Sequence, residues 1–421
     1  MTYIEFFDKT SVENVGACLS YVPDRAILIG TDEKQLGLMN KYALRYERLF
    51  SDRGYSVPFL TRAVGERGLE SAIELLEELV HTYDDCVFDV TGGDELLVLA
   101  LGIVYARNPD SSIQIHRFNL RNNTILDYDK DGVTVWQEPP TLSIDENVRI
   151  YGGDVVYGEI HEDKTYLWDL TPGFLRDVEI MWSSCRRDVR RWNAQIGVLE
   201  AMELVGTVSE DGLTTTATIA EVDAYLSKFR ASSSVLGGLA RYMVRQKLLT
   251  HFDDTDGVNI TVSYKNEQVK KCMTKAGQAL EMKIYTTVKA LTGKGNEPLY
   301  NDALNGVVID WDGTLHDEAE EGIYDTENEI DVMLMHGIVP VFVSCKNGIV
   351  TSEELYKLNA VAERFGGTYA KKVLVATSVG AMGEAGQYLC QRARDMGIRL
   401  IEGVQTMSDA ELQRELRTLW K

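Results

Sequence analysis

The sequence predicts an α/β protein with a doubly wound N-terminal domain, a helical middle region and a second α/β domain near the C-terminus. Five short apolar runs between residues 3 and 118 alternate with segments of helical period, which is typical of a mostly parallel sheet. Further on, residues 328–346 have the pattern of a β-hairpin with helices and strands on either side. At 421 residues the chain is long enough for two or three domains.

The N-terminal domain is expected to bind its ligand beyond the carboxyl ends of its strands. These strands are predicted over 3–7, 26–31, 55–59, 86–90 and 113–118, and the clearest helices over 33–52 and 66–83. Three loops follow strands and precede helix N-termini, where free backbone N–H groups favour a phosphate. We therefore predict these ligand-binding residues: Asp8, Lys9, Thr10, Gly30, Thr31, Asp32, Thr91, Gly92, Gly93 and Asp94.

The third of these loops has two interpretations. Gly92 and Gly93 let the backbone approach a phosphate closely. The alternative is a tight strand-to-helix turn in which Asp94 caps the helix. Both interpretations stay open at this point.

The segment Asp89-Val90-Thr91-Gly92-Gly93 at a strand end resembles CARF domains, the CRISPR-associated Rossmann-type sensors of cyclic oligoadenylates. In relatives the turn is followed by Thr-Lys, whereas this chain has Asp94-Glu95. Two acids beside a bound anion should weaken its binding unless they cap the helix and point away from it. The resemblance implies a cyclic oligoadenylate activator, with cyclic tetra-adenylate favoured and the ring size left open. It also implies a homodimer, because a symmetric ring suits a two-fold site.

Pro139-Pro140 is the best boundary marker, so the domains are predicted as 1–140, 141–266 and 267–421. Residues 145–180 show no clear pattern. Residues 196–265 resemble a winged helix, with helices near 197–204, 215–229 and 232–249 and a wing at 257–263. This region either reads DNA or serves as a spacer or dimer contact.

The densest basic cluster of the chain lies in this middle part. Arg186, Arg187, Arg190 and Arg191 stand beside Trp192. A run of charge is usually a solvated helix face. In so acidic a chain, four arginines beside a tryptophan also suit a groove for nucleic acid.

The predicted hairpin carries charge at one end only. Successive strand residues point to opposite faces, so Glu329 and Asp331 share one face, and Ser344 and Lys346 share one face of the partner strand. With the turn centred on Gly337-Ile338, Asp331 lies opposite Ser344 and Lys346 opposite Glu329. Such a patch suits metal-assisted phosphodiester cleavage, in which the acid holds Mg²⁺. The alternative is an ordinary salt bridge at a solvated hairpin end.

The hairpin resembles the core of the PD-(D/E)xK nuclease fold, in which an acid opens the first strand and an acid-x-Lys triplet closes the second. Ser344 stands in place of the second acid, so other oxygens must complete the site. Glu329 is one candidate, and Glu281 is another, in a segment that looks like the Gly-x-x-Leu-Glu helix of this fold. The resemblance implies Mg²⁺ or Mn²⁺ held by Asp331 and Glu281, and these catalytic residues: Asp331, Lys346, Glu281, Ser344 and Glu329.

The last domain begins at residue 267 with a helix over 267–290, followed by a strand over 306–310 and the hairpin. The strand, hairpin, helix, strand order is that of the nuclease core. Together, the two ends of the chain resemble CARF-domain effector nucleases of type III CRISPR systems. This resemblance implies a cyclic-oligoadenylate-activated endonuclease in antiviral defence, and it leaves open whether DNA or RNA is cut.

Two other functions remain as alternatives. The segment 307–315 matches the signature of haloacid-dehalogenase-type phosphatases, with Asp310 as nucleophile and Asp312 as general acid and base. Against this function, no paired aspartates follow a later strand to hold Mg²⁺. A non-catalytic CARF and winged-helix regulator acting on DNA would leave Asp331 and Lys346 without a role.

Composition limits the partners and the compartment. A formal charge of −22 argues against a protein that coats duplex DNA non-specifically, since phosphate contacts need cationic surface. Six scattered cysteines without a CxxC pair indicate neither a zinc site nor a disulfide framework, which fits a reducing cytoplasm. No run approaches the roughly 18 apolar residues of a membrane span. We expect a cytoplasmic protein without a membrane partner.

Overall fold

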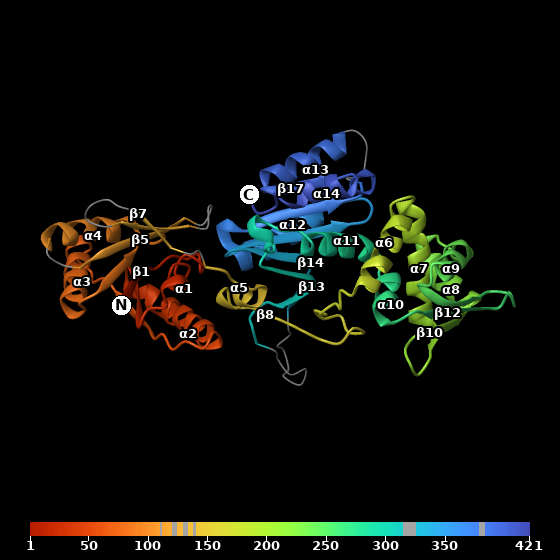
Figure 1. Ribbon diagram of the computed structural model, residues 1–421, viewed down its shortest axis with the longest axis horizontal. Helices are drawn as coiled ribbons and strands as arrows, with labels where there is room; N and C mark the ends of the chain where they lie inside the picture. The colour runs from red at the N-terminus through yellow and green to blue at the C-terminus, as the bar shows by residue number, and fades with distance from the viewer. Residues whose placement is uncertain (110–111, 120–123, 129–133, 138–139, 315–325, 379–383) are drawn as a thin grey trace.

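The computed structural model describes residues 1–109, 112–119, 124–128, 134–137, 140–314, 326–378 and 384–421. Figure 1 shows an elongated molecule with one sheet at each end and a third in the middle. The chain passes from the N-terminal end to the far end and then returns to build most of the middle. The predicted α/β fold class is confirmed. Within the described ranges, no helix has the length and apolar character needed to cross a membrane.

The N-terminal sheet has the strand order β3-β2-β1-β4-β5-β6-β7. The strands from β3 to β5 pair in parallel, and β6 and β7 extend the sheet with antiparallel pairs. Because β1 lies between β2 and β4, the loops after these three strands meet at one edge. The elements are β1 (Thr2–Phe6), α1 (Cys18–Tyr21), β2 (Arg25–Gly30), α2 (Leu36–Asp52), β3 (Phe59–Ala63), α3 (Leu69–Thr82), β4 (Cys86–Asp89), α4 (Glu95–Arg107), β5 (Gln114–Asn119), β6 (Thr124–Tyr128) and β7 (Thr134–Gln137).

The far end combines helices with a four-stranded sheet of order β11-β12-β10-β9. The helix predicted over 215–229 is wrong in its first part, because the β-branched residues of Thr214–Thr218 form a strand and Thr218 then caps the helix. The elements are α6 (Pro172–Cys185), α7 (Val189–Val205), β9 (Thr207–Val208), β10 (Thr214–Thr218), α8 (Ile219–Leu226), α9 (Leu236–Arg245), β11 (Leu249–Asp253), β12 (Asn259–Tyr264) and α10 (Glu267–Thr274).

The middle sheet has the order β17-β16-β15-β14-β13-β8 and contains the predicted hairpin as β14 and β15. His336 pairs with Val339, so the turn lies at Gly337 and Ile338 as predicted. The helix predicted over 267–290 is instead two helices, since Gly277 has a φ of +92° that ends helical geometry. The elements are α11 (Gln278–Lys289), β13 (Asp302–Asp310), β14 (Glu327–His336), β15 (Val339–Lys346), α12 (Ser352–Gly366), β16 (Lys371–Ala376), α13 (Glu384–Asp395), β17 (Ile398–Glu402) and α14 (Asp409–Leu416).

The segment after the predicted boundary belongs to this middle sheet. Pro139 lies outside the described residues, and α5 (Ile144–Ile150) and β8 (Asp154–Val155) follow Pro140. Strand β8 pairs with the end of β13, so residues that the sequence left unassigned extend the C-terminal sheet. The start of α5 has a sequence signature, because Ser143 and Glu146 form a capping box. A helix of seven residues, however, has too little hydrophobic periodicity to be predicted from the sequence.

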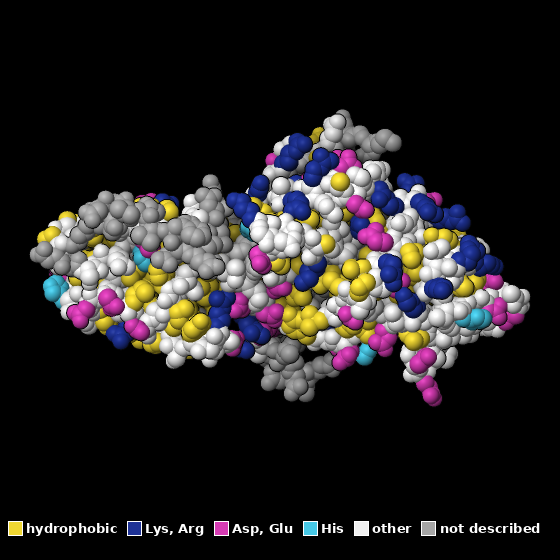
Figure 2. All heavy atoms as spheres, viewed as in Figure 1, with side chains coloured by type: hydrophobic (Ala, Val, Ile, Leu, Met, Phe, Trp, Pro, Cys, Tyr) yellow, Lys and Arg dark blue, Asp and Glu magenta, His cyan; other side chains and the backbone are white. Residues whose placement is uncertain are grey.

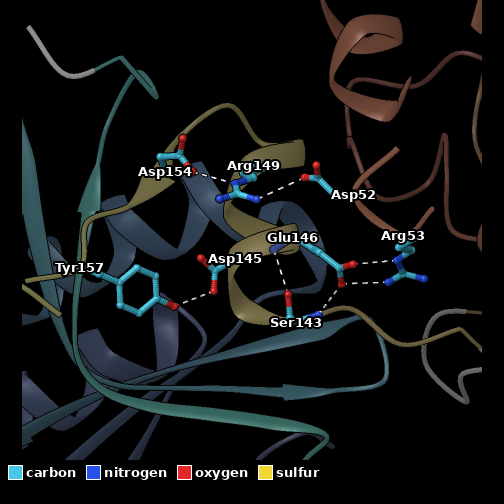
Figure 3. Close-up of polar contacts among 8 residues, drawn as sticks. All are labelled: Asp52, Arg53, Ser143, Asp145, Glu146, Arg149, Asp154 and Tyr157. Carbon is cyan, nitrogen blue, oxygen red and sulfur yellow. Dashed lines mark hydrogen bonds and ion pairs between the residues drawn. The ribbon is translucent and has the colours of Figure 1, made fainter. Parts of the chain in front are cut away.

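Helix α5 links the N-terminal domain to the middle sheet (Figure 3). The Glu146 carboxylate accepts two hydrogen bonds from the Arg53 guanidinium, at 2.7 and 2.8 Å, just beyond the end of α2. On the same helix, Arg149 pairs with Asp52 at 3.3 Å and with Asp154 of β8 at 2.8 Å. One short helix therefore ties α2 to the strand that borders β13.

Candidate functional site

The two hairpin strands separate at Asp331, and its side chain replaces the next backbone hydrogen bond. Pairing of β14 with β15 ends at Val332 and Val343. One Asp331 carboxylate oxygen then accepts hydrogen bonds from the Cys345 backbone N–H at 2.5 Å and from Ser344 Oγ at 3.2 Å. The carboxylate is therefore held across the gap between the strands, with Ser344 as a hydrogen-bond donor to it.

Two further carboxylates join Asp331. Glu281 lies in the first turn of α11 and is 4% exposed. A Cβ at Gly277 would lie 3.2 Å from Glu281 Oε1, so the glycine gives this carboxylate room as well as the required φ. Glu329 is exposed on β14, and one oxygen from each of the three carboxylates lies within 4.8 Å of the others. The predicted acids thus form one cluster that opens to solvent beside Glu329.

The cluster is electrostatically strained without a cation. Burial, and then the charge of Asp331, raise the pKa of Glu281 to about 8. Burial also raises the pKa of Asp331 above its ordinary value, although the Cys345 N–H and the Lys346 charge oppose this. Like charges held close together in a partly buried site favour either a proton or a bound cation.

The donor set fits a divalent cation. Among the described residues, the buried Glu281 Oε2 has no hydrogen-bond partner, which is costly for a carboxylate. Mg²⁺ and Mn²⁺ prefer oxygen ligands at about 2.1 Å, and three oxygens within 4.8 Å of one another can close on one ion with small side-chain shifts. Asn305 supports the arrangement, because it donates to the Asp331 carbonyl at 2.8 Å and accepts from Gln278 at 2.9 Å.

The predicted pairing of Lys346 with Glu329 is wrong. Lys346 Nζ lies 2.8 Å from Glu354 of α12, whereas Glu329 pairs with Lys275 at 2.5 Å. The reason is that the strands part at Asp331, so residues beyond it no longer face each other across a ladder. Burial lowers the pKa of Lys346, but the Glu354 hydrogen bond and the Asp331 charge outweigh this and raise it, so the lysine stays cationic.

Lys275, Asn305 and Glu354 belong to the site and were not predicted. Lys275 precedes the Gly277 break by two residues, and Glu354 lies in the acidic first turn of α12. Both positions have ordinary structural explanations in sequence, as a charged loop residue and as a favourable helix-dipole contact. Only their three-dimensional contacts with Glu329 and Lys346 distinguish them.

Two of the three loops predicted to bind the activator, those after β1 and β4, come together at the ends of these strands. A Cβ at Gly92 would lie 2.8 Å from Asp8 Cβ and 2.9 Å from Glu13 Oε2, so these two loops touch. Asp8 holds its own loop by accepting from the Thr10 N–H at 2.7 Å. Glu13 was not predicted, because its place in the site depends on the turns after β1.

The remaining predicted activator residues have local structural roles as well. Asp94 accepts from the Leu96 N–H at 2.8 Å and caps α4, so the capping alternative is correct for its side chain. Asp32 caps the short turn before α2, and the Thr31 N–H donates to Gln35. Lys9 is exposed. Ligand binding by these residues stays a prediction.

The phosphatase signature lies elsewhere on the middle sheet. Asp310 ends β13 opposite Glu327, four residues along β14 from Asp331, which is about 13 Å of strand. Strand β14 lies between β13, which carries Asp310, and β15, which carries Ser344. Asp312 faces the junction with α2, and Leu315 lies outside the described residues.

Comparison with known proteins shows the fold. No model of a known protein family and no curated protein matches the chain. Among solved structures, protein VC1899 from Vibrio cholerae is similar over 100% of this chain and 97% of its own, with a TM-score of 0.71 at 16% identity. Can2 from Sulfobacillus thermosulfidooxidans, solved in complex with cyclic tetra-adenylate, is similar over 99% and 97% of the two chains, with a TM-score of 0.64 at 14% identity. Over at least 99% of its length, this chain therefore has the fold of VC1899 and Can2.

Proposed function

We propose that this chain is a nuclease that requires a divalent metal and is activated by a cyclic oligoadenylate. The observation that carries the proposal is the cluster of Glu281, Glu329 and Asp331, with Lys346 at the end of the same buried hairpin and within the electrostatic field of Asp331. The fold shared with Can2, which binds cyclic tetra-adenylate, supports that ring as the activator. DNA and RNA are both candidate substrates.

Each side chain has a distinct task in this proposal. A cation at the cluster would polarise the phosphodiester and lower the pKa of a bound water. Glu281 and Asp331 would hold the cation, with Glu329 completing the open side. Lys346 places a positive charge where the non-bridging oxygens gain charge in the transition state, and Glu354 orients its ammonium.

Helix α4 supports the proposed homodimer. Its outward face exposes Val98 at 43% and Leu99 at 55%, and Ile103 lies in the same shallow hollow. An apolar helix face next to the Gly92 turn suits a second copy of the chain, since a two-fold axis there would bring two activator sites together around one symmetric ring.

Contacts between the loop after β1, which contains Thr10 and Glu13, and the middle domain support a route by which the activator could switch on the nuclease site of the same chain. Glu13 hydrogen bonds with Tyr369, just after α12, and a Cβ at Gly367 would lie 3.3 Å from Thr10. Helix α12 carries Glu354, the ion-pair partner of Lys346. A phosphate bound at Gly92 would lie close to the Glu13 carboxylate and repel it. Because Glu13 contacts Tyr369 just after α12, this repulsion would be transmitted to α12, whose Glu354 positions Lys346.

Paired variants separate the nuclease from the phosphatase. Asp331→Asn is expected to abolish activated cleavage of nucleic acid, because it removes a ligand charge from the metal cluster. Asp310→Asn should retain cleavage at least in part, since Asp310 lies about 13 Å of strand away. The measurement is activated nuclease rate and p-nitrophenyl phosphate turnover for both variants. Loss of phosphate ester turnover in Asp310→Asn, with Asp331→Asn unaffected, would overturn the proposal.

Stability should depend on pH through Glu13. Burial, and then the nearby Asp8, raise the pKa of Glu13 to about 7, although the Tyr369 hydrogen bond opposes this. The folded state therefore binds a proton more tightly than the unfolded state, and stability is lost as pH rises from about 4.5 to 7. Glu13→Gln is expected to melt at a higher temperature than wild type at pH 8 and close to wild type at pH 5. An equal difference at both pH values would contradict this assignment.

A further inference from the structure

The arginine cluster at the start of α7 has no structural partner that explains it. Arg187, Arg190 and Arg191 are exposed, and within the described ranges none of them forms an ion pair. The fourth member, Arg186, is different, because it donates to the carbonyls of Gln405 and Met407 and holds a loop. Three arginines therefore remain as free cationic surface in a chain of formal charge −22.

Hydrogen bonds hold this surface next to the end of β15, the strand that ends at Lys346. Asn347, which follows Lys346, donates to Asn193 Oδ1 at 2.8 Å, and Asn193 donates back to the Asn347 carbonyl at 2.5 Å. Asn347 also contacts Cys185 Sγ at 3.2 Å. The end of α6 and the first turns of α7 therefore both meet the residue next to Lys346.

The arginines lie close in sequence to the residues that contact Asn347. Arg190 lies three residues before Asn193 on α7, so the two share a helix face. Arg187 lies two residues after Cys185, in the short loop between the helices. Figure 2 shows Lys and Arg side chains gathered over the part of the molecule that contains α6, α7 and α9. The strand end that carries Lys346 is thus in contact, through Asn347, with the helices that carry the arginines.

Local charge favours a polyanion over a protein partner at this surface. Asp188 is the nearest carboxylate in sequence, and it is committed to capping α7 by accepting from the Arg191 N–H at 3.0 Å. Guanidinium groups bind phosphate oxygens in a planar, two-donor geometry. Contacts of this kind position a nucleic acid without reading its sequence.

We propose that Arg187, Arg190 and Arg191 bind the phosphodiester backbone of the nucleic acid substrate and lead it to Lys346 and the acid cluster. This inference rests on the proposed nuclease function and assigns its substrate path. It also gives the far domain a task, namely to hold the substrate rather than only to separate the other two domains.

Binding is measured in the Asp331→Asn background, so that no cleavage occurs, with activator present. The probes are a fluorescein-labelled 20-nucleotide single-stranded DNA and the RNA of the same sequence. Replacing the three arginines by alanine is expected to weaken binding at least about tenfold at 0.1 M salt. It should also reduce the slope of log affinity against log salt by about 2, because roughly 0.7 to 0.9 counterions are released per phosphate contact.

Two matched variants complete the test. Lys289, Lys294 and Arg414 are exposed on the same domain as the acid cluster, and their triple alanine variant changes net charge equally, so it should leave the slope nearly unchanged. The triple variant Arg187→Lys, Arg190→Lys and Arg191→Lys should retain most of the wild-type slope. If the arginine variant binds both probes like the control while wild type still cuts, the inference fails and the nuclease proposal stands. If the protein neither binds nor cuts either probe, both fail.

Discussion

Lys346→Ala is expected to lower the activated cleavage rate about a hundredfold, which corresponds to about 3 kcal/mol of transition-state stabilisation. The ammonium is held at the rim of an apolar strand by Glu354 at 2.8 Å and lies in the field of Asp331. A preorganised cation there acts on charge that develops only during cleavage. The rate and the melting temperature are measured on the same preparation.

A structural role for this lysine predicts the opposite pattern. Loss of a partly exposed ion pair should cost at most about 1 kcal/mol of stability and leave the cleavage rate nearly unchanged. Lys357→Ala is the matched control, because Lys357 is exposed and pairs with Glu353 within α12, the helix that carries Glu354. A Lys346→Ala variant that melts early but cuts like wild type would make the hairpin a scaffold.

Gly92→Val is expected to abolish stabilisation by the activator. A Cβ at Gly92 would already lie 2.8 Å from Asp8 Cβ and 2.9 Å from Glu13 Oε2, so a branched side chain must displace the loop after β1. Wild type at an activator concentration one hundred times its Kd should gain about 2.7 kcal/mol of stability, and the variant should lose most of this gain. Thermal melts with and without cyclic tetra-adenylate measure both.

Gly197→Val controls for the general cost of the substitution. Gly197 lies in α7, and an added Cβ there would meet nothing within 4 Å. This variant should respond to the activator as wild type does. If Gly92→Val also responds fully, the activator binds away from the loops after β1 and β4.

The hairpin and its acids could be predicted because their information is local. Alternation of period two, with a glycine at the turn, predicts that Asp331 lies near Ser344, and the two side chains are hydrogen bonded. Glu281 was predicted from a resemblance, and the structure places it in the same cluster. Strand β1 and its neighbours were predicted for the same reason, since buried parallel strands are continuous apolar runs.

The contacts of the charged side chains could not be predicted in the same way. Lys346 pairs with Glu354 because α12 packs over β15, and nothing in the strand sequence specifies which helix covers it. Likewise, Lys275 lies in the break between α10 and α11, and its contact with Glu329 depends on where the fold places that break. Long flexible side chains choose among several acids, and tertiary packing decides which acid is within reach.

One cleavage assay on the wild-type protein tests whether it is a metal-dependent nuclease that a cyclic oligoadenylate activates. Single-stranded DNA, RNA and plasmid are each incubated with Mg²⁺ or Mn²⁺, with and without cyclic tetra-adenylate and other ring sizes. We expect cleavage of at least one nucleic acid only when both a divalent metal and a cyclic oligoadenylate are present, and none in the presence of EDTA. Cleavage that is unaffected by the cyclic oligoadenylates, or no cleavage of any substrate under any of these conditions, would contradict it.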